Sequence, residues 1–240
     1  FMAGTTQRRD LLKHSVPSKS ASALTRSCMC HLQRSGRAQA ARKRLGRRVA
    51  VVYRNWVHPD EPDISISQRT YDVTISVLLE TELGSFTIAV DDAKAPVTAA
   101  NFLRYVDEGL LDDAEAYRIV TYENQNPQSV HKIEVVQWGY HTTDDRPAPY
   151  PPIAHETTEM TGISHKDMTV SMARFAVGSA ASEFFICIGD QPELDFGGRR
   201  NPDGQGFAAF GQVVDGRDTV MKIFAEAETG AGNEYKKQPV

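Results

Sequence analysis

The amino-acid sequence predicts a mainly β domain in which a closed antiparallel sheet is capped by helices. Short apolar segments recur between stretches rich in Pro, Gly and Asp, which is typical of strands joined by turns. Only two segments have a helical period, and they lie far apart in the chain. This arrangement argues against alternating β-α-β units and favours a sheet closed by its own strands.

The first regular segment predicts a β-hairpin. Every second residue is apolar in 73–79, ETELG at 80–84 turns the chain, and the alternation returns in 86–90. A period of two is the pattern of a strand with one buried face. Further strands are predicted in five apolar segments, which cover residues 116–120, 132–137, 168–173, 183–188 and 207–214.

Two segments have the period of an amphipathic helix. From Ala99 onward, apolar residues fall at i, i+3, i+4 and i+7 before Gly109 provides a stop. The second segment covers about 216–225, where Val220 and Phe224 share a face. We expect these helices to cap the sheet.

Charge is divided unevenly along the chain. Residues 1–70 hold 14 Lys and Arg against 4 Asp and Glu, which leaves 13 basic and 27 acidic residues for the rest. Such asymmetry is typical of a tail or targeting segment joined to a folded domain. We therefore expect a basic unstructured or targeting segment, a linker, the β domain and a C-terminal tail, which cover residues 1–57, 58–71, 72–226 and 227–240.

The basic segment leaves several interpretations open. Its Arg, Ser and Ala content is typical of a transit peptide and equally of a disordered arm. Nucleic-acid binding is a weaker hypothesis, because no aromatic residues are interleaved to stack on bases. No apolar run reaches the ~18 residues of a membrane span, so we expect no membrane partner. Cysteine usage favours the cytoplasm and leaves export open, and Cys187 in its apolar segment is expected to be buried.

Motifs of other chemistries are incomplete. Cys28, Cys30 and His31 would give three zinc ligands where a structural site needs four. HETTE at 155–159 lacks the second His of a zinc-protease motif. The glycine-rich stretch 197–206 lacks the Lys and Ser/Thr of a phosphate-binding loop and is interpreted as a hairpin connection. We therefore expect no metal or other cofactor.

The segment AYRIV at 116–120 places the charged Arg118 inside an apolar strand. Taken alone, it favours an arginine that points to solvent, because alternate strand residues face opposite sides. Other phrases follow one another in a specific order: LGSFTIAV, KAPVTAANFLRYVDEG, AYRIV, VVQWG, VSMAR, SEFFICIGD, ELDF and GFAAFGQVVDGRDTV. From about residue 72 to 226 the chain thereby resembles the cyclophilin family of peptidyl-prolyl isomerases.

The resemblance implies a closed eight-stranded β-barrel with a helix at each end. It also implies cis/trans isomerisation of Xaa-Pro bonds in unfolded or flexible proteins, by a monomer without cofactor. Arg118 matches the position of the family's catalytic arginine, and Gln137 that of its active-site glutamine. The positions that match the substrate groove are Phe185, Ala173, Met172, Leu194, Val135, Phe207 and Glu183.

The chemistry of the reaction suits these residue types. Rotation about the prolyl amide has a barrier of ~18–20 kcal/mol, and the prolyl nitrogen regains its lone pair as the bond twists. A fixed donor such as Arg118 therefore stabilises the twisted state selectively. One charged hydrogen bond contributes only ~1.5–3 kcal/mol, so an apolar slot around Phe185 and a polar group such as Gln137 on the carbonyl side are also required. A proline-peptide-binding or chaperone module with little turnover is the alternative on the same fold.

The chain departs from the family pattern at several positions. An insertion at 121–134 precedes the glutamine, and as a loop beside the groove it is expected to shape substrate choice. Glu134 stands where the family usually has an aromatic residue, while Tyr117 and Phe207 each replace a histidine. Glu193 occupies the position of a tryptophan found in cyclosporin-sensitive members. We therefore predict weak cyclosporin binding.

Overall fold

The structure is a computed structural model of the chain. It describes residues 48–55, 73–112, 114–140, 142–237 and 239–240. The basic segment up to residue 47, the linker at 58–71 and the three candidate zinc ligands therefore lie outside the described residues.

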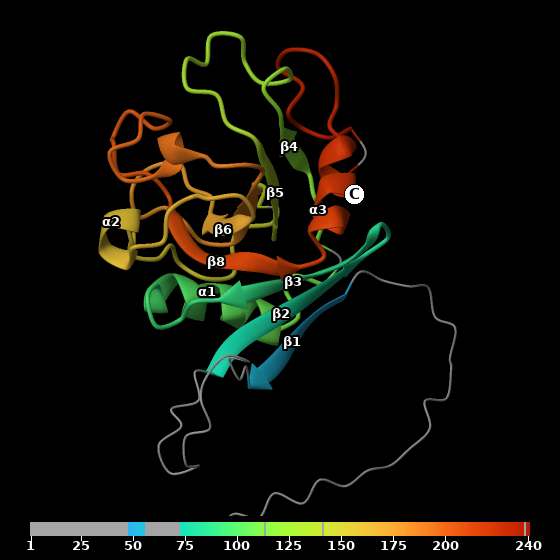
Figure 1. Cartoon of the computed structure of the whole chain (residues 1–240), viewed down its shortest axis with the longest axis vertical. Coiled ribbons are helices and arrows are strands. Elements are labelled where there is room, and N and C mark those ends of the chain that lie inside the picture. The colour runs from blue at the N-terminus through green and yellow to red at the C-terminus, as the bar shows by residue number, and fades with distance from the viewer. Residues whose placement is uncertain (1–47, 56–72, 113, 141, 238) are drawn as a thin grey trace, which may run out of the picture. The chain divides into compact units, whose positions relative to one another are not determined.

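Eight antiparallel strands form one curled sheet, which confirms the mainly β prediction (Figure 1). Their spatial order is β1-β2-β3-β8-β6-β7-β5-β4. No ladder among the described strands joins the outer strands β1 and β4, so the sheet is an open half-barrel rather than the fully closed barrel that was expected. The strands are β1 (Arg48–Asn55), β2 (Val73–Thr81), β3 (Gly84–Val90), β4 (Arg118–Val120), β5 (Val135–Gly139), β6 (Thr169–Met172), β7 (Glu183–Cys187) and β8 (Ala208–Asp215).

Strand β1 lies in a segment that we expected to be unstructured or to act in targeting. It pairs antiparallel with β2, from Arg48 opposite Glu80 to Asn55 opposite Val73. Its sequence, RVAVVYRN, is rich in the β-branched residues that favour strands, and the outer edge of β2 offers unpaired backbone groups. The expected boundary at residue 57 is therefore corrected, because the sheet already begins at Arg48.

The C-terminal segment, expected to be a tail, lies along the outer edge of β4. The Ala116 amide donates to the Val240 carbonyl and the Lys236 amide to the Tyr117 carbonyl, each at 2.8 Å. The Ile119 amide donates to the Glu234 carbonyl, also at 2.8 Å. The end of the chain thus belongs to the β domain and satisfies the edge of its shortest strand.

Two helices cap the sheet where the sequence predicts them. Helix α1 (Pro96–Asp107) contacts β1 and β8, and helix α3 (Arg217–Ala225) contacts β3 and β5 (Figure 1). Both helices place buried side chains in the same main hydrophobic core. Two shorter helices were not predicted: α2 (Thr158–Thr161) and the 3-10 helix η2 (Pro192–Leu194).

The HETTE segment at 155–159 caps the first turns of α1 and α2. The buried Glu156 carboxylate accepts hydrogen bonds from the amides of Val97 and Thr98 in the first turn of α1, at 3.1 and 2.7 Å. These amides lack partners inside the helix, so an anionic acceptor stabilises the helix start. Thr157 caps α2 by accepting a hydrogen bond from the Met160 amide.

The buried apolar residues form two separate clusters. Alternation along β7 divides them, because Phe184 and Ile186 belong to the large main core while Phe185 and Cys187 face the other way. Cys187 is fully buried, as predicted. The smaller cluster, here called the second cluster, consists of Val120, Ile133, Val135, Phe185, Cys187, Leu194 and Phe207.

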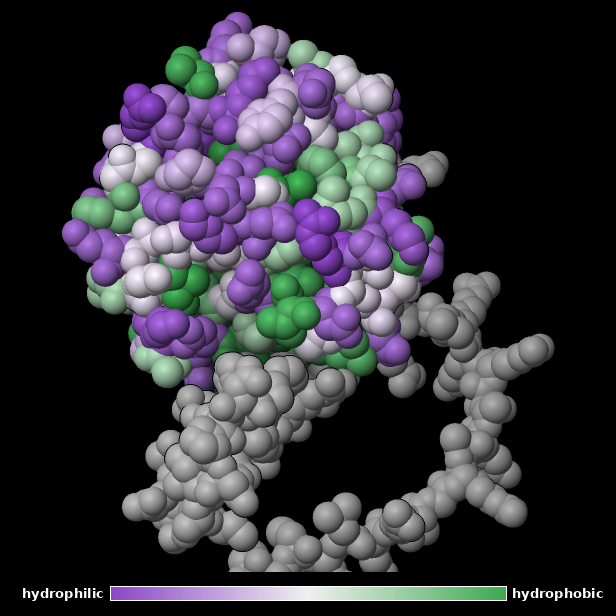
Figure 2. Space-filling model, viewed as in Figure 1, coloured by the Kyte–Doolittle hydropathy of each residue, from purple (hydrophilic) through white to green (hydrophobic). Residues whose placement is uncertain are grey.

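On the surface, hydrophilic residues surround scattered hydrophobic ones over the face seen in Figure 2. This is the ordinary surface of a domain whose large apolar side chains are mostly enclosed. Among the described residues, no helix has both the length and the apolar character required to cross a bilayer.

Candidate active site

A cavity of about 640 Å³ opens beside the second cluster. It brings together eight of the nine predicted site residues, which are Arg118, Gln137, Phe185, Ala173, Leu194, Val135, Phe207 and Glu183. Met172 is the exception and corrects the prediction, because it is 2% exposed and packs in the main core. Neighbouring residues at the end of β6 face opposite sides, so Ala173 reaches the cavity and Met172 does not.

One half of the cavity is an apolar slot. Phe185 and Phe207 meet edge to face with ring centroids 5.4 Å apart, and Leu194 and Val135 are almost completely buried beside them. Edge-to-face contacts fix the orientation of aromatic rings. The small Ala173 side chain leaves room between these walls for an apolar ring of a ligand.

A buried polar chain lies beneath the slot. The His165 ring stacks on Phe185 at 6.0 Å; its Nδ1 donates to Asp195 Oδ1 at 2.7 Å, and its Nε2 is 2.9 Å from Ser171 Oγ. Burial acts to raise the pKa of Asp195, but the hydrogen bonds from His165 outweigh it and the pKa falls below its ordinary value. Ser171 is fully buried, so this Ser-His-Asp arrangement supports Phe185 instead of presenting a nucleophile.

The other half of the cavity is polar and centres on Arg118. In the register of β4 and β5, Arg118 lies opposite Gln137, and Arg118 Nη1 donates to Gln137 Oε1 at 2.9 Å. The C-terminal segment contributes Glu234, whose Oε1 is 3.6 Å from Nη2, and Tyr235, whose ring lies 5.5 Å from the guanidinium carbon. Arg118 Nε is buried and has no hydrogen-bond partner. Arg118 thus lines the cavity with one donor group that no protein atom satisfies.

Tyr117 and Glu183 hold the amide of Gln137. Gln137 Nε2 donates to the Tyr117 hydroxyl and, at 3.0 Å, to Glu183 Oε2, while the Tyr117 hydroxyl donates to the same carboxylate oxygen. These contacts fix the amide with its oxygen toward Arg118. Burial, followed by the negative charge of Glu183, raises the pKa of Tyr117 far above its ordinary value. Tyr117 thus remains a neutral donor at physiological pH.

The glycine-rich connection at 197–206 forms a wall of the cavity, which sequence reasoning missed. It supplies Arg200 and Asn201, and Asn201 Nδ2 is buried without a partner. The connection is anchored by Arg174, which donates to both carboxylate oxygens of Asp203 at 2.7 and 2.8 Å. The signal in the sequence was the pair of arginines directly after ELDFGG.

This connection also approaches the slot closely. Gly206 has φ +61, and a Cβ there would lie 2.5 Å from the Leu194 carbonyl oxygen. The Gly206 carbonyl accepts a hydrogen bond from Arg174 Nε at 2.7 Å, and the Phe207 amide donates to Leu194 at 2.9 Å. A residue without a side chain is therefore required to bring Phe207 onto Leu194.

The insertion at 121–134 lies beside the cavity, as expected. Ile133 lines the cavity and belongs to the second cluster, whereas Glu134 does not line it. Gln125 is buried; its Nε2 donates to the carbonyls of Thr121 and Ile133 at 2.7 and 3.0 Å. The insertion is thus held by its own buried amide, and Ile133 adds an apolar side chain to the cavity wall.

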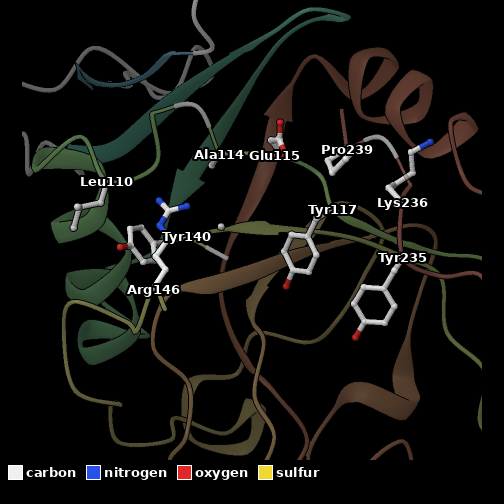
Figure 3. A pocket seen from close by; sticks show the side chains of 10 residues that line it. Leu110, Ala114, Glu115, Tyr117, Tyr140, Arg146, Tyr235, Lys236 and Pro239 are labelled. Carbon is white, nitrogen blue, oxygen red and sulfur yellow. The ribbon is translucent and has the colours of Figure 1, made fainter. Parts of the chain in front are cut away.

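A second cavity of about 250 Å³ adjoins the first (Figure 3). The two cavities share Tyr117 and Tyr235, whose rings stack with centroids 6.4 Å apart and whose hydroxyls point the same way in Figure 3. Arg146 and Tyr140 also line the smaller cavity, and the Arg146 guanidinium carbon lies over the Tyr140 ring, 3.8 Å from its centroid. The two shared tyrosines separate the smaller cavity from the polar half of the larger one.

The fold and the cavity define a β domain with an apolar slot for a ring and fixed hydrogen-bond donors beside it. The family model described as "Cyclophilin type peptidyl-prolyl cis-trans isomerase/CLD" matches residues 76–240, which are most of the chain. The chain therefore belongs to the cyclophilin-type peptidyl-prolyl cis-trans isomerases, and the resemblance drawn from the sequence is confirmed.

Curated relatives agree with this assignment. Peptidyl-prolyl cis-trans isomerase A of Dickeya dadantii is 33% identical over 68% of this chain and 77% of its own. The isomerase cyp18 of Streptomyces antibioticus is 31% identical over 69% of this chain and 92% of its own. Isomerase B of Escherichia coli is 30% identical over 68% of this chain and 94% of its own. A cyclophilin type isomerase of Cryptosporidium parvum, crystallised in the presence of the dipeptide ala-pro, has a TM-score of 0.49 at 16% identity, over 68% of this chain and 92% of its own.

Proposed function

We propose that this chain accelerates cis/trans isomerisation of Xaa-Pro bonds in unfolded or flexible segments of proteins, with Arg118 as the catalytic residue. One observation carries the proposal: Arg118, whose Nε has no hydrogen-bond partner, lines a cavity whose opposite half is an apolar slot. A proline ring fits the apolar half, and its nitrogen then lies toward the donor.

The proposed mechanism is selective stabilisation of the twisted amide. In the planar bond the nitrogen lone pair is delocalised into the carbonyl and accepts hydrogen bonds poorly. At the twisted transition state the lone pair returns to nitrogen, and the Arg118 donor then binds it. A hydrogen bond to a charged donor contributes ~1.5–3 kcal/mol, which corresponds to about one or two decades in rate.

The remaining residues position these groups. Phe185, Phe207 and Leu194 hold the proline ring away from water, which strengthens the Arg118 interaction and limits the ring to productive orientations. Gln137 acts as a positioning residue, because its amide oxygen already binds Arg118 and its amide nitrogen already donates to Tyr117 and Glu183. This assignment differs from a direct contact between Gln137 and the substrate carbonyl.

Exchange NMR on a short Ala-Pro-containing peptide tests the proposal with the full chain. At substoichiometric protein we expect cis and trans resonances to exchange on the second timescale, although the uncatalysed reaction takes tens to hundreds of seconds. Peptide chemical-shift changes without faster exchange would contradict catalysis. They would instead support the alternative of a proline-peptide-binding or chaperone module on the same fold.

A further inference from the structure

Arg200 lies on the glycine-rich wall and lines the large cavity together with Arg118. Its Nη1 donates to Gln125 Oε1 at 3.2 Å and to the His131 carbonyl at 2.8 Å. Both acceptors are neutral and belong to the insertion at 121–134. The insertion therefore holds the guanidinium in place without neutralising it.

The other charged groups around the cavity already have partners. Asp203 binds Arg174 through both oxygens, and Glu234 lies 3.6 Å from Arg118. Glu193, whose main-chain carbonyl accepts from the Arg200 amide, directs its carboxylate to Arg199 at 3.1 Å and to His131 at 3.5 Å. Glu183 accepts from Gln137, Tyr117 and the Thr142 amide.

Within the described residues, Arg200 itself forms no ion pair. Burial and the nearby positive charge of Arg118 lower the pKa of Arg200, and Glu234 opposes this only in part. A partly buried cation beside a like charge is unfavourable, and an incoming anion relieves both effects. Because both hydrogen bonds of the guanidinium use Nη1, its Nε and Nη2 groups keep donors for a ligand.

We propose that Arg200 is a specificity-determining residue that binds a carboxylate side chain, Asp or Glu, next to the proline of the substrate. The inference rests on the proposed isomerase function and names its substrate class. A guanidinium suits this ligand, because its planar donors match the two oxygens of a carboxylate. The insertion contributes to specificity by orienting Arg200 through Gln125 and His131.

The test compares isosteric peptides that carry Glu or Gln at the residue before or after the proline. For the full chain we expect kcat/KM to be about fivefold higher for Glu in at least one of the two positions, as expected for an ion pair at a partly buried site. Arg200→Gln should reduce this Glu/Gln ratio to about 1, whereas Arg200→Lys should retain part of it.

Arg199→Gln is the matched control, because it removes the same charge from the neighbouring, exposed position of the same loop. This variant should keep the Glu/Gln ratio of the wild-type chain. The ratio should also fall as salt is raised from about 0.05 to 0.5 M, because salt screens an accessible ion pair.

Two outcomes would overturn the inference. Equal rates for the Glu and Gln peptides would contradict it while leaving the isomerase function intact, and so would a preference that persists in Arg200→Gln. If no peptide is isomerised, the proposed function fails independently. Chemical-shift titrations of the same peptides would then still show whether Arg200 binds Glu more tightly than Gln.

Discussion

The two halves of the cavity are held by different forces. In the apolar half, Phe185 and Leu194 are fixed by packing in the second cluster, and Phe185 also stacks on the buried His165 ring. In the polar half, Arg118 and Gln137 are fixed by hydrogen bonds that join β4, β5 and β7, and Arg118 also forms an ion pair with Glu234 of the C-terminal segment. Packing tolerates exchange of similar apolar volumes, whereas hydrogen bonds depend on single atoms. The apolar half should therefore govern stability and binding, and the polar half the rate.

The largest expected effect is on stability. Phe185→Ala removes a ring that is 4% exposed and that packs on both Phe207 and His165. We expect the free energy of unfolding to fall by about 3–5 kcal/mol, because a buried Phe→Ala change loses transfer free energy and leaves a cavity. Urea denaturation measures this loss. Phe185→Leu, which keeps most of the volume, should lose less than half as much, and an equal loss would contradict a packing role.

A smaller effect on rate is expected from Tyr117→Phe. The change removes the hydroxyl that binds Gln137 and Glu183 but keeps the ring. Loss of a hydrogen bond worth about 0.5–1.5 kcal/mol should lower kcat about two- to tenfold with KM nearly unchanged. Exchange NMR at saturating peptide measures kcat, with Tyr140→Phe as the control in the smaller cavity. A change in KM alone would indicate that Tyr117 binds substrate instead of positioning Gln137.

The same residue predicts a flat pH profile. Because the pKa of Tyr117 is raised, its hydroxyl stays protonated in the wild-type chain throughout the neutral range. We expect kcat to vary less than about twofold between pH 6 and 9, because the Tyr117 hydroxyl does not lose its proton in this range. Loss of activity with an apparent pKa near 8 would contradict the neutral hydrogen-bond network.

The smallest expected effect concerns the anchor of the glycine-rich wall. Arg174 lowers the pKa of Asp203 to about 2, against about 3.9 in an unfolded chain. A lowered folded-state pKa stabilises the fold above about pH 4, and this contribution is lost as the pH falls from about 4 to 2. Asp203 is exposed and screened by solvent, so the change in Tm over this range should be small. This pH-dependent change in Tm should be smaller in the Asp203→Asn variant than in the control variant Asp92→Asn. Equal changes in the two variants would contradict the role of Asp203 as an anchor.

Most of the fold could be predicted from the sequence because its signals are local. Alternation predicts β2 and β3, short apolar segments predict β4 to β8, and a period of 3.6 residues predicts α1 and α3. Strand β1 was missed, because its pairing depends on a free edge of β2, which the sequence of the segment alone does not show. The open edge of β4 and its cover by the C-terminal segment likewise arise from contacts between distant residues.

The candidate site divides in the same way. Apolar groove residues such as Phe185 and Leu194 were predicted because they belong to motifs in strands or next to them. Met172 was wrongly placed, because the sequence motif does not show which of two adjacent residues faces the cavity. Arg200 and Asn201 were missed, since a loop without periodicity gives no indication of where its side chains point. The weak cyclosporin binding expected from Glu193 stays a prediction.

The account is tested most directly by the rate of cis/trans exchange of a bound Xaa-Pro peptide in the full chain and its Arg118→Ala variant. At saturating peptide, exchange NMR should show kcat reduced about ten- to one-hundredfold in the variant, with KM changed less than threefold. This result would assign the rate to the polar half and binding to the apolar half. An unchanged kcat, or a loss of binding with kcat intact, would contradict the role of Arg118 as the donor to the twisted amide.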